Sequence, residues 1–158
     1  MKTTNLLLIL VAVMSLVSCG QLHVVTLYVD TANIEQATIA ANANFGQPTG
    51  ISNEDYTTHV RKRDRIIWDA VSISDPSDVV EITSINHISG DRIFERKTGI
   101  IQPESFSWNG ITQLLVATKI KTRPGTQKAY LMEKYGLEFK VAGKEGTFLI
   151  DPVIKAYR

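Results

Sequence analysis

Short alternating segments with turn signals between them run through most of this chain and constrain its fold more than any other feature. The clearest segment has charged residues at positions 134, 138 and 140 and apolar residues at Tyr135, Leu137, Phe139 and Val141. Alternation of this kind gives a strand one buried face and one solvated face. A strand of this type buries its apolar face against a second layer, so the pattern predicts a layered all-β fold.

About eight short strands are expected, with little helix and no internal repeat. Pro76 and the Asn109-Gly110 pair mark two of the intervening turns, and the pair is typical of a type I′ hairpin. Residues 31–44 contain three asparagines and fit either a short helix or an irregular excursion. We therefore predict one antiparallel β-sandwich of the immunoglobulin, cupredoxin or jelly-roll kind, with strands over residues 22–29, 56–62, 64–71, 79–85, 92–95, 114–120, 135–141, 147–150 and 153–157.

The N-terminal residues have the composition of a secretion signal. Lys2 supplies a positive charge, and the eight residues 6–13 form an unbroken apolar run, which is shorter than the roughly 20 residues that a membrane-spanning helix needs. The stretch from Leu16 to Gly20 resembles the lipobox of bacterial lipoproteins, in which the cysteine, here Cys19, becomes the lipid-modified first residue. An ordinary signal peptide with an incidental cysteine is the alternative.

The lipobox resemblance divides the chain into three parts. It implies a lipoprotein signal peptide over residues 1–18, a lipidated N-terminus and tether over residues 19–21, and the β domain over residues 22–158. Two or more acyl chains give stable membrane anchoring. Gly20 stands where an aspartate would favour inner-membrane retention, and no acidic cluster follows it. We therefore expect an outer-membrane anchor that faces the periplasm.

Charge and cysteine content exclude several classes of function. The whole chain has 17 basic and 16 acidic side chains, and loss of Lys2 makes the two counts equal. An equal balance predicts no basic field for nucleic acid or for an anionic lipid surface. Cys19 is the only cysteine, so the domain has neither a disulfide nor a free thiolate, and we expect no cofactor.

Several stretches resemble the bacterial inclusion-body protein family, also called the AidA/PixA family. They are residues 60–68, similar to Val-x-x-Gly-Asp-x-Val-x-aromatic, residues 79–94, and residues 135–154, which end like Gly-x-Tyr-x-x-Asp-Pro-x-Ile. Arg63 replaces the usual glycine, and Ile150 stands where an aromatic residue often precedes Asp-Pro. The resemblance implies a β-sandwich without catalytic residues. A lipid-anchored member would differ from the soluble members that form inclusions.

The sequence offers few residues that could bind a metal ion. A type 1 copper site is excluded because it needs a cysteine thiolate, and Cys19 is expected to be acylated. His59 and His87 are weak candidates for a copper or zinc site, with Met132 as a further ligand. No histidine pair has the spacing of metal ligands, so unrelated surface histidines, His23 among them, are the favoured interpretation.

Carboxylates and serines likewise give no catalytic motif. The serines have no Gly-x-Ser-x-Gly setting. Several aspartates could form a glycosidase-like pair or a calcium site, but we expect them to cap turns and strand ends. The aspartates in question are Asp64, Asp69, Asp75, Asp78 and Asp91.

Two further features could contact a ligand. The densest charge cluster consists of Arg61, Lys62, Arg63 and Arg65. It is either a patch that binds an anion or a partner protein or, in the interpretation that we prefer, a solvated turn. Trp68 lies between apolar neighbours and is expected in the core. Trp108 adjoins the predicted hairpin turn and is the better candidate for an exposed aromatic residue that stacks on a sugar.

Three functional hypotheses follow. The leading one is a non-catalytic, lipid-anchored cell-envelope protein whose β domain binds another protein or itself. The second is a module that binds a glycan or small ligand through Trp108, with Arg61 and Arg63 as further contacts. The third is a cupredoxin-like metal-binding protein without a type 1 site. We do not expect an enzyme.

Overall fold

The computed structural model describes residues 20–94, 100–101, 104–108, 111–119 and 128–157. Strands dominate these residues, and two short helical segments, η1 (Gln36–Thr38) and α2 (Ile39–Asn42), follow the first strand. The strands are β1 (Leu22–Val29), β2 (Ala43–Asn44), β3 (Thr57–Arg61), β4 (Arg65–Ser72), β5 (Val80–Gly90), β6 (Ile100–Ile101), β7 (Glu104–Trp108), β8 (Ile111–Lys119), β9 (Tyr130–Val141), β10 (Phe148–Ile150) and β11 (Val153–Tyr157).

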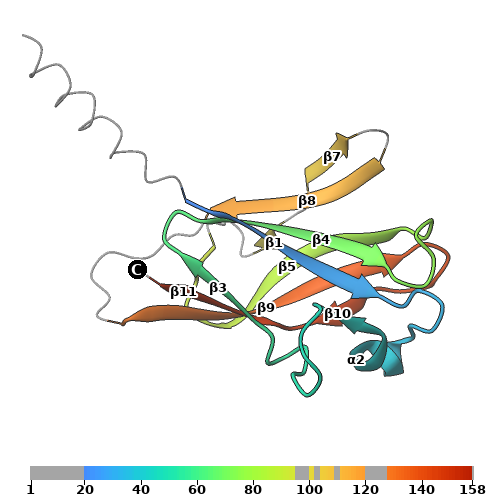
Figure 1. Cartoon of the computed structure of the whole chain (residues 1–158), viewed down its shortest axis with the longest axis horizontal. Coiled ribbons are helices and arrows are strands. Elements are labelled where there is room, and N and C mark those ends of the chain that lie inside the picture. The colour runs from blue at the N-terminus through green and yellow to red at the C-terminus, as the bar shows by residue number, and fades with distance from the viewer. Residues whose placement is uncertain (1–19, 95–99, 102–103, 109–110, 120–127, 158) are drawn as a thin grey trace, which may run out of the picture.

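The strands form two sheets that lie face to face (Figure 1). The first sheet has the order β2-β1-β4-β8-β7, and the second has the order β3-β11-β9-β5-β6, with β10 added beside β9. Fully buried side chains from both sheets meet between them, among them Leu27 and Ile66 from the first and Leu137 and Ile154 from the second. The all-β prediction is confirmed.

Two strand pairs are parallel, so the prediction of a wholly antiparallel sandwich was wrong for them. β1 pairs with β4, and β11 pairs with β3, each in parallel register. Sequence patterns identify strands and tight hairpins, but parallel partners are joined by long crossover connections that leave no local signal. The pairing of the last strand with β3 therefore depends on tertiary packing.

The alternating segments are buried as predicted. Val25, Leu27 and Val29 are the buried residues of β1. In β9 the residues 135, 137, 139 and 141 are buried as well. The period of two in the sequence therefore marks the core face of these two strands correctly.

The strand predicted over residues 79–85 extends five residues further in the structure. β5 continues to Gly90, and β9 begins at Tyr130, so this antiparallel pair is longer than predicted. Asp91 extends the pairing, because its N–H donates to the Met132 carbonyl over 2.7 Å and its carboxylate accepts the Met132 N–H over 3.2 Å. Of the strand predicted over residues 92–95, only a single bridge at Phe94 is present, and residue 95 lies outside the described ranges.

The ambiguous segment after β1 contains both a short helix and irregular chain. Asn42 donates from Nδ2 to the Asn33 carbonyl, and Asn33 donates from Nδ2 to the Asp30 carboxylate. Asp30 in turn donates its N–H to the Asn42 carbonyl over 2.8 Å. The asparagines, which are poor helix formers, thus hold this irregular segment together through their hydrogen bonds.

The hairpin prediction is consistent with the strand register around it. β7 and β8 are antiparallel neighbours with Trp108 opposite Ile111, whereas Asn109 and Gly110 themselves lie outside the described residues. The predicted signal peptide and Cys19 also lie outside them. Within the part of the chain that is described, no helix combines the length and the apolar character needed to cross a membrane.

Candidate functional site

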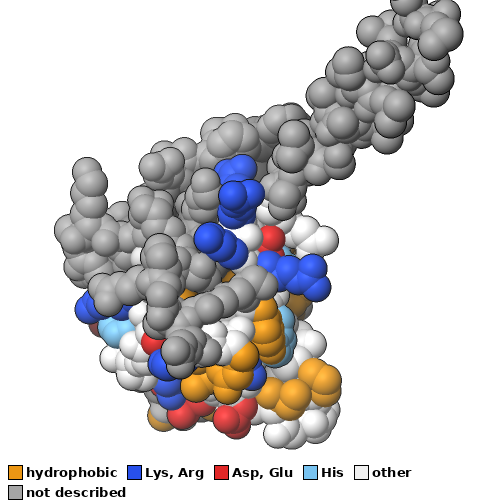
Figure 2. Space-filling model, turned by 90° about the vertical axis from the view of Figure 1, so that its left-hand side faces the viewer, with side chains coloured by type: hydrophobic (Ala, Val, Ile, Leu, Met, Phe, Trp, Pro, Cys, Tyr) orange, Lys and Arg blue, Asp and Glu red, His pale blue; other side chains and the backbone are white. Residues whose placement is uncertain are grey.

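The turn between β3 and β4, residues 61–65, carries the densest group of positive side chains; we call it the basic turn. Arg61, Lys62, Arg63 and Arg65 are exposed, whereas Asp64 between them is 4% exposed. The turn lies at the end of the molecule where β1 begins (Figure 1). Figure 2 faces this end and shows Lys and Arg side chains gathered beside one another, with hydrophobic side chains next to them.

The buried carboxylate of Asp64 organises the basic turn. One oxygen accepts the Gln21 N–H over 2.8 Å, and the other accepts the Arg61 N–H over 2.7 Å and His23 Nε2 over 2.8 Å. Burial alone would raise the pKa of Asp64, but these hydrogen bonds outweigh it and hold the pKa below the ordinary value of 3.8. Asp64 is therefore a structural anion that joins the turn to the start of the chain's described part.

The backbone of the basic turn is strained at Arg63. Its φ of 77° lies in the left-handed region, and it is the non-glycine residue with a positive φ among those described. This is the position at which the sequence motif usually has glycine. The β3–β4 turn therefore has the conformation of a glycine turn while carrying an arginine side chain.

The residues before β1 are docked on the same turn. Arg65 donates its N–H to the Gln21 carbonyl over 2.8 Å. At Gly20 a Cβ atom would lie 1.9 Å from the Arg63 carbonyl oxygen, so only glycine fits. Residues 20–21 therefore lie against the basic turn.

A second feature lies on the outer side of the second sheet, where β3, β11 and β9 are neighbours. Their register places His59, Lys155 and Met132 in one row, and Tyr157 and Tyr130 side by side in the next. We call these five residues the aromatic face. Tyr130 is 40% exposed and Met132 is 48% exposed, although both belong to well-paired strands.

Lys155 lies at the centre of the aromatic face. Its Nζ is 3.8 Å from the ring centre of Tyr130 and 5.8 Å from that of Tyr157, distances typical of cation–π contacts. His59 stacks on Tyr157, and a 3.1 Å hydrogen bond joins its Nδ1 to the phenolic oxygen. The face thus presents a fixed cation between two aromatic rings.

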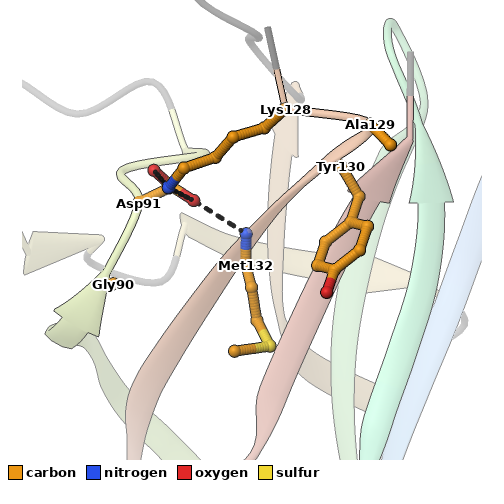
Figure 3. Close-up of a pocket in the computed structure, with 6 residues that line it drawn as sticks. All are labelled: Gly90, Asp91, Lys128, Ala129, Tyr130 and Met132. Carbon is orange, nitrogen blue, oxygen red and sulfur yellow. Dashed lines mark hydrogen bonds and ion pairs between the residues drawn. The ribbon is translucent and has the colours of Figure 1, made fainter. Parts of the chain in front are cut away.

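A shallow hollow of about 670 Å³ adjoins the aromatic face. Tyr130 and Met132 extend along one side of it, and Lys128 reaches across to Asp91 (Figure 3). Lys128 Nζ is 2.9 and 3.1 Å from the two Asp91 oxygens, and this ion pair is the first cause that lowers the pKa of Asp91. Gly90, Asp91, Lys128, Ala129, Tyr130 and Met132 line the hollow.

The three histidines do not share a site. His59 lies on the outer face of the second sheet, whereas His87 pairs in register with the buried Tyr135, and a 2.9 Å hydrogen bond joins its Nδ1 to buried Glu133. His23 belongs to the basic turn through Asp64. Among the side chains that the structure describes, no three of His, Cys, Asp and Glu are grouped to hold a metal ion.

The other candidate carboxylates are separated as well. Asp75 accepts the N–H and the hydroxyl of Ser77, and Asp78 accepts the hydroxyl of Thr31. Asp69 differs, because burial raises its pKa despite one hydrogen bond from the Ala70 N–H. Asp75 and Asp78 therefore serve turns and loops, whereas Asp69 lies within β4.

Trp68 is buried, as predicted. Its Nε1 donates to the Tyr135 hydroxyl over 3.0 Å, and its ring packs edge-on against Tyr135 and Phe94. Burial raises the pKa of Tyr135. Trp108 ends β7, and its side chain lies outside the described part of the structure.

Sequence reasoning selected Arg61 and His59 but missed the residues that surround them. Tyr130, Lys155 and Tyr157 lie far from β3 in the sequence, and the parallel pairing of β3 with β11 brings them to it. A local signal was present in Val153–Tyr157, where Lys155 and Tyr157 alternate with buried Ile154 and Ala156. That signal marks an outer face, but it does not identify the neighbouring strand.

Comparison with known proteins gave a distant similarity among solved structures. No protein-family model and no curated protein matches the chain. Among solved structures, the chain is similar to the inclusion body protein PixA from Burkholderia cenocepacia J2315, with 15% identity and a TM-score of 0.40 over 90% of this chain and 98% of that one. Membership of the inclusion-body protein family therefore stays a prediction.

Proposed function

We propose that this protein is a non-catalytic lipoprotein of the bacterial cell envelope whose β domain binds a protein partner through the aromatic face. Acylated Cys19 attaches it to the outer membrane, and the domain faces the periplasm. The observation that carries the binding role is the Tyr130–Lys155–Tyr157 cluster on the neighbouring strands β9 and β11, in which Tyr130 is exposed and the other two side chains are half-buried.

The composition of the aromatic face supports a binding role. Tyrosine and methionine are enriched in the centres of protein interfaces, where a few such residues supply most of the binding energy. Lys155 forms no ion pair with a carboxylate within the described residues, so its charge is available to a partner. The strands hold these side chains in place, which lowers the entropy lost on binding.

The lipobox resemblance supports the anchor. Leu16, Ser18 and Cys19 occupy the positions that the signal peptidase and the acylating enzymes would read, and Gly20 follows instead of an aspartate. Metabolic labelling with palmitate tests this part of the proposal. The full-length protein should incorporate label, and Cys19→Ala should incorporate none; equal labelling of both would contradict it.

A glycan or small ligand is the second candidate, favoured by the hollow beside Tyr130. An exposed aromatic ring at the edge of a concavity can stack on the apolar face of a sugar. The aromatic face would serve in either case, so the two candidates differ in the partner and not in the site.

Photo-crosslinking in intact cells separates the candidates. A photoreactive phenylalanine analogue at position 130 of the full-length protein should give a discrete protein adduct, and the same analogue at exposed position 145 should not. Tyr157→Ala, introduced together with the probe, should abolish the adduct while the protein remains folded. Identical products from positions 130 and 145 would refute a protein-binding role for this face. Retention on a polysaccharide resin that depends on Tyr157, without an adduct, would favour the glycan.

A further inference from the structure

We infer that the basic turn contacts the anionic phosphates of lipid headgroups in the membrane that holds the anchor. The inference rests on the proposed acylation of Cys19 and goes beyond it, because it assigns a second contact with the membrane and an orientation to the domain. Four features of the described residues carry it: the docking of the chain start, the charge of the turn, the strain at Arg63 and the exposed apolar residues beside it.

The chain has no slack between the anchor position and the basic turn. Gln21 donates to the Asp64 carboxylate and accepts the Arg65 N–H, and Gly20 lies against the Arg63 carbonyl. Residue 19 is bonded to Gly20, and consecutive Cα atoms are about 3.8 Å apart. Acyl chains on Cys19 would therefore bring the membrane surface to this end of the domain.

Among the described residues, no carboxylate side chain forms an ion pair with the basic turn. The four basic side chains are exposed. The one carboxylate in the turn is buried and accepts three internal hydrogen bonds. The equal overall balance of charge thus conceals a local positive cluster.

An arginine at position 63 costs conformational free energy that a glycine would not. A left-handed backbone costs a non-glycine residue roughly ten-fold in equilibrium relative to glycine. Backbone strain at one position is often connected with function, because a side chain is then kept where glycine would fit better. At a turn beside the anchor, the property that arginine adds and glycine lacks is a guanidinium group suited to phosphate.

Apolar side chains accompany the basic ones at the start of β1. Leu22 is 54% exposed and Val24 is 60% exposed, and in the parallel register they lie beside Arg65 and Ile67. A surface that combines exposed aliphatic residues with basic residues is suited to the interface between headgroups and acyl chains. This composition favours a lipid surface over a free anion as the occupant.

Anionic lipid should strengthen the contact in a salt-dependent way. Each Lys or Arg near an anionic membrane surface contributes about five-fold to association, and the effect falls off within about 10 Å at moderate salt. Four such residues held rigidly at the surface would fix the orientation of a domain that the acyl chains alone leave free to rotate.

The test uses the full-length, acylated protein reconstituted in vesicles. Since Cys19 is the only cysteine and is acylated, Lys62→Cys supplies a unique thiol for an environment-sensitive fluorophore. Headgroup spin-labelled lipid should quench this probe several-fold more in vesicles of phosphatidylcholine with phosphatidylglycerol than in phosphatidylcholine alone. High salt should remove the difference. The matched control is Glu145→Cys, in the exposed turn that follows the C-terminal end of β9. Quenching of a probe at this position should be weak in both kinds of vesicle.

Charge variants complete the experiment. Arg63→Gly should keep the turn folded and reduce the dependence of quenching on phosphatidylglycerol, and Arg61→Gln with Arg65→Gln should reduce it further. Equal quenching at position 62 in the two kinds of vesicle, or equal quenching at positions 62 and 145, would overturn the inference. Vesicle flotation separates the two proposals: protein that does not float overturns the anchor and the inference together. Protein that floats without lipid-dependent quenching overturns the inference alone.

Discussion

The carboxylate of Asp64 lies where three segments meet: the residues before β1, the end of β3 and the start of β4. It is buried, and it accepts hydrogen bonds from two backbone N–H groups and one histidine. Arg63 beside it adopts a left-handed backbone. At the residue scale, therefore, the basic turn combines one strongly stabilising contact with one strained residue, and each can be tested separately.

Replacement of Asp64 should destabilise the domain. Asp64→Ala leaves the Gln21 and Arg61 N–H groups without their acceptor and should cost roughly 3 kcal/mol, because hydrogen bonds to a buried charged group contribute about 1.5–3 kcal/mol each. Asp64→Asn keeps one acceptor oxygen and should cost about half as much. Urea unfolding measures both. Equal stability of Asp64→Ala and the wild type would show that the carboxylate does not hold the turn.

Arg63→Gly should stabilise the protein. Relief of the left-handed strain gains roughly 1–2 kcal/mol, and the extra freedom of glycine in the unfolded chain offsets about 0.5–1 kcal/mol of this. The melting temperature should rise by about 3 °C. The control is Lys62→Gly, which removes the same charge at a residue without positive φ and should lower stability. A lower melting temperature for Arg63→Gly would contradict the strain.

At the scale of elements, the long β5–β9 pair carries both the hollow and part of the aromatic face. Its end is fixed by Gly90, Asp91 and Met132, through two hydrogen bonds that continue the pairing beyond the last residue of β5. Glu133 on the inner side is fully buried and accepts the Ile93 N–H over 2.6 Å and a hydrogen bond from His87. The end of this pair is therefore held from both faces of the sheet.

Gly90→Ala should loosen the end of this pair. The new Cβ would lie 2.4 Å from the Met132 carbonyl oxygen, and the φ of 85° disfavours alanine. Overpacking and strain together should cost roughly 3 kcal/mol, with faster amide exchange at Asp91. Gly143→Ala is the control, because its φ is 78° but no atom lies within 4 Å of the added Cβ, so it should cost only about 1 kcal/mol. Equal costs for the two variants would exclude the steric contact with Met132.

The whole molecule should lose stability in acid. Hydrogen bonds and, for Asp91, Lys128 lower the pKa values of Asp64 and Asp91 in the folded state. Their contribution to stability is therefore fully present above the unfolded value of about 4 and is lost as the pH falls through the lower folded values. The urea concentration at the unfolding midpoint should be constant near neutral pH and should decrease once the pH is below about 4.

Asp69 should act in the opposite sense. Burial raises its folded pKa, so stability falls as the pH rises from the unfolded value to the raised folded value, and the full loss is present above it. Asp69→Asn should therefore raise the urea midpoint at pH 7 and have little effect at low pH. Asp64→Asn should instead reduce the decrease of the urea midpoint in acid. A loss of stability in Asp69→Asn at pH 7 would refute the raised pKa.

The sequence by itself determined the class of fold and most strand positions. The alternation at residues 135–141 and the apolar face of residues 25–29 mark buried strand faces, because a strand's side chains point to opposite sides in turn. Trp68 was placed in the core by its apolar neighbours, and the basic turn by its charge. These features depend on local order, which the sequence records directly.

Only the tertiary structure decided which strands are neighbours and what their outer faces contain. The parallel β3–β11 pair joins His59 to Lys155 and Tyr157, and the docking of Gln21 on Asp64 joins the start of the domain to the basic turn. Neither contact leaves a local signal, because the partners lie far apart in the chain and meet only when the two sheets close over a shared core. The four basic residues of the turn are adjacent in the sequence, but only the fold shows that the carboxylate between them is buried.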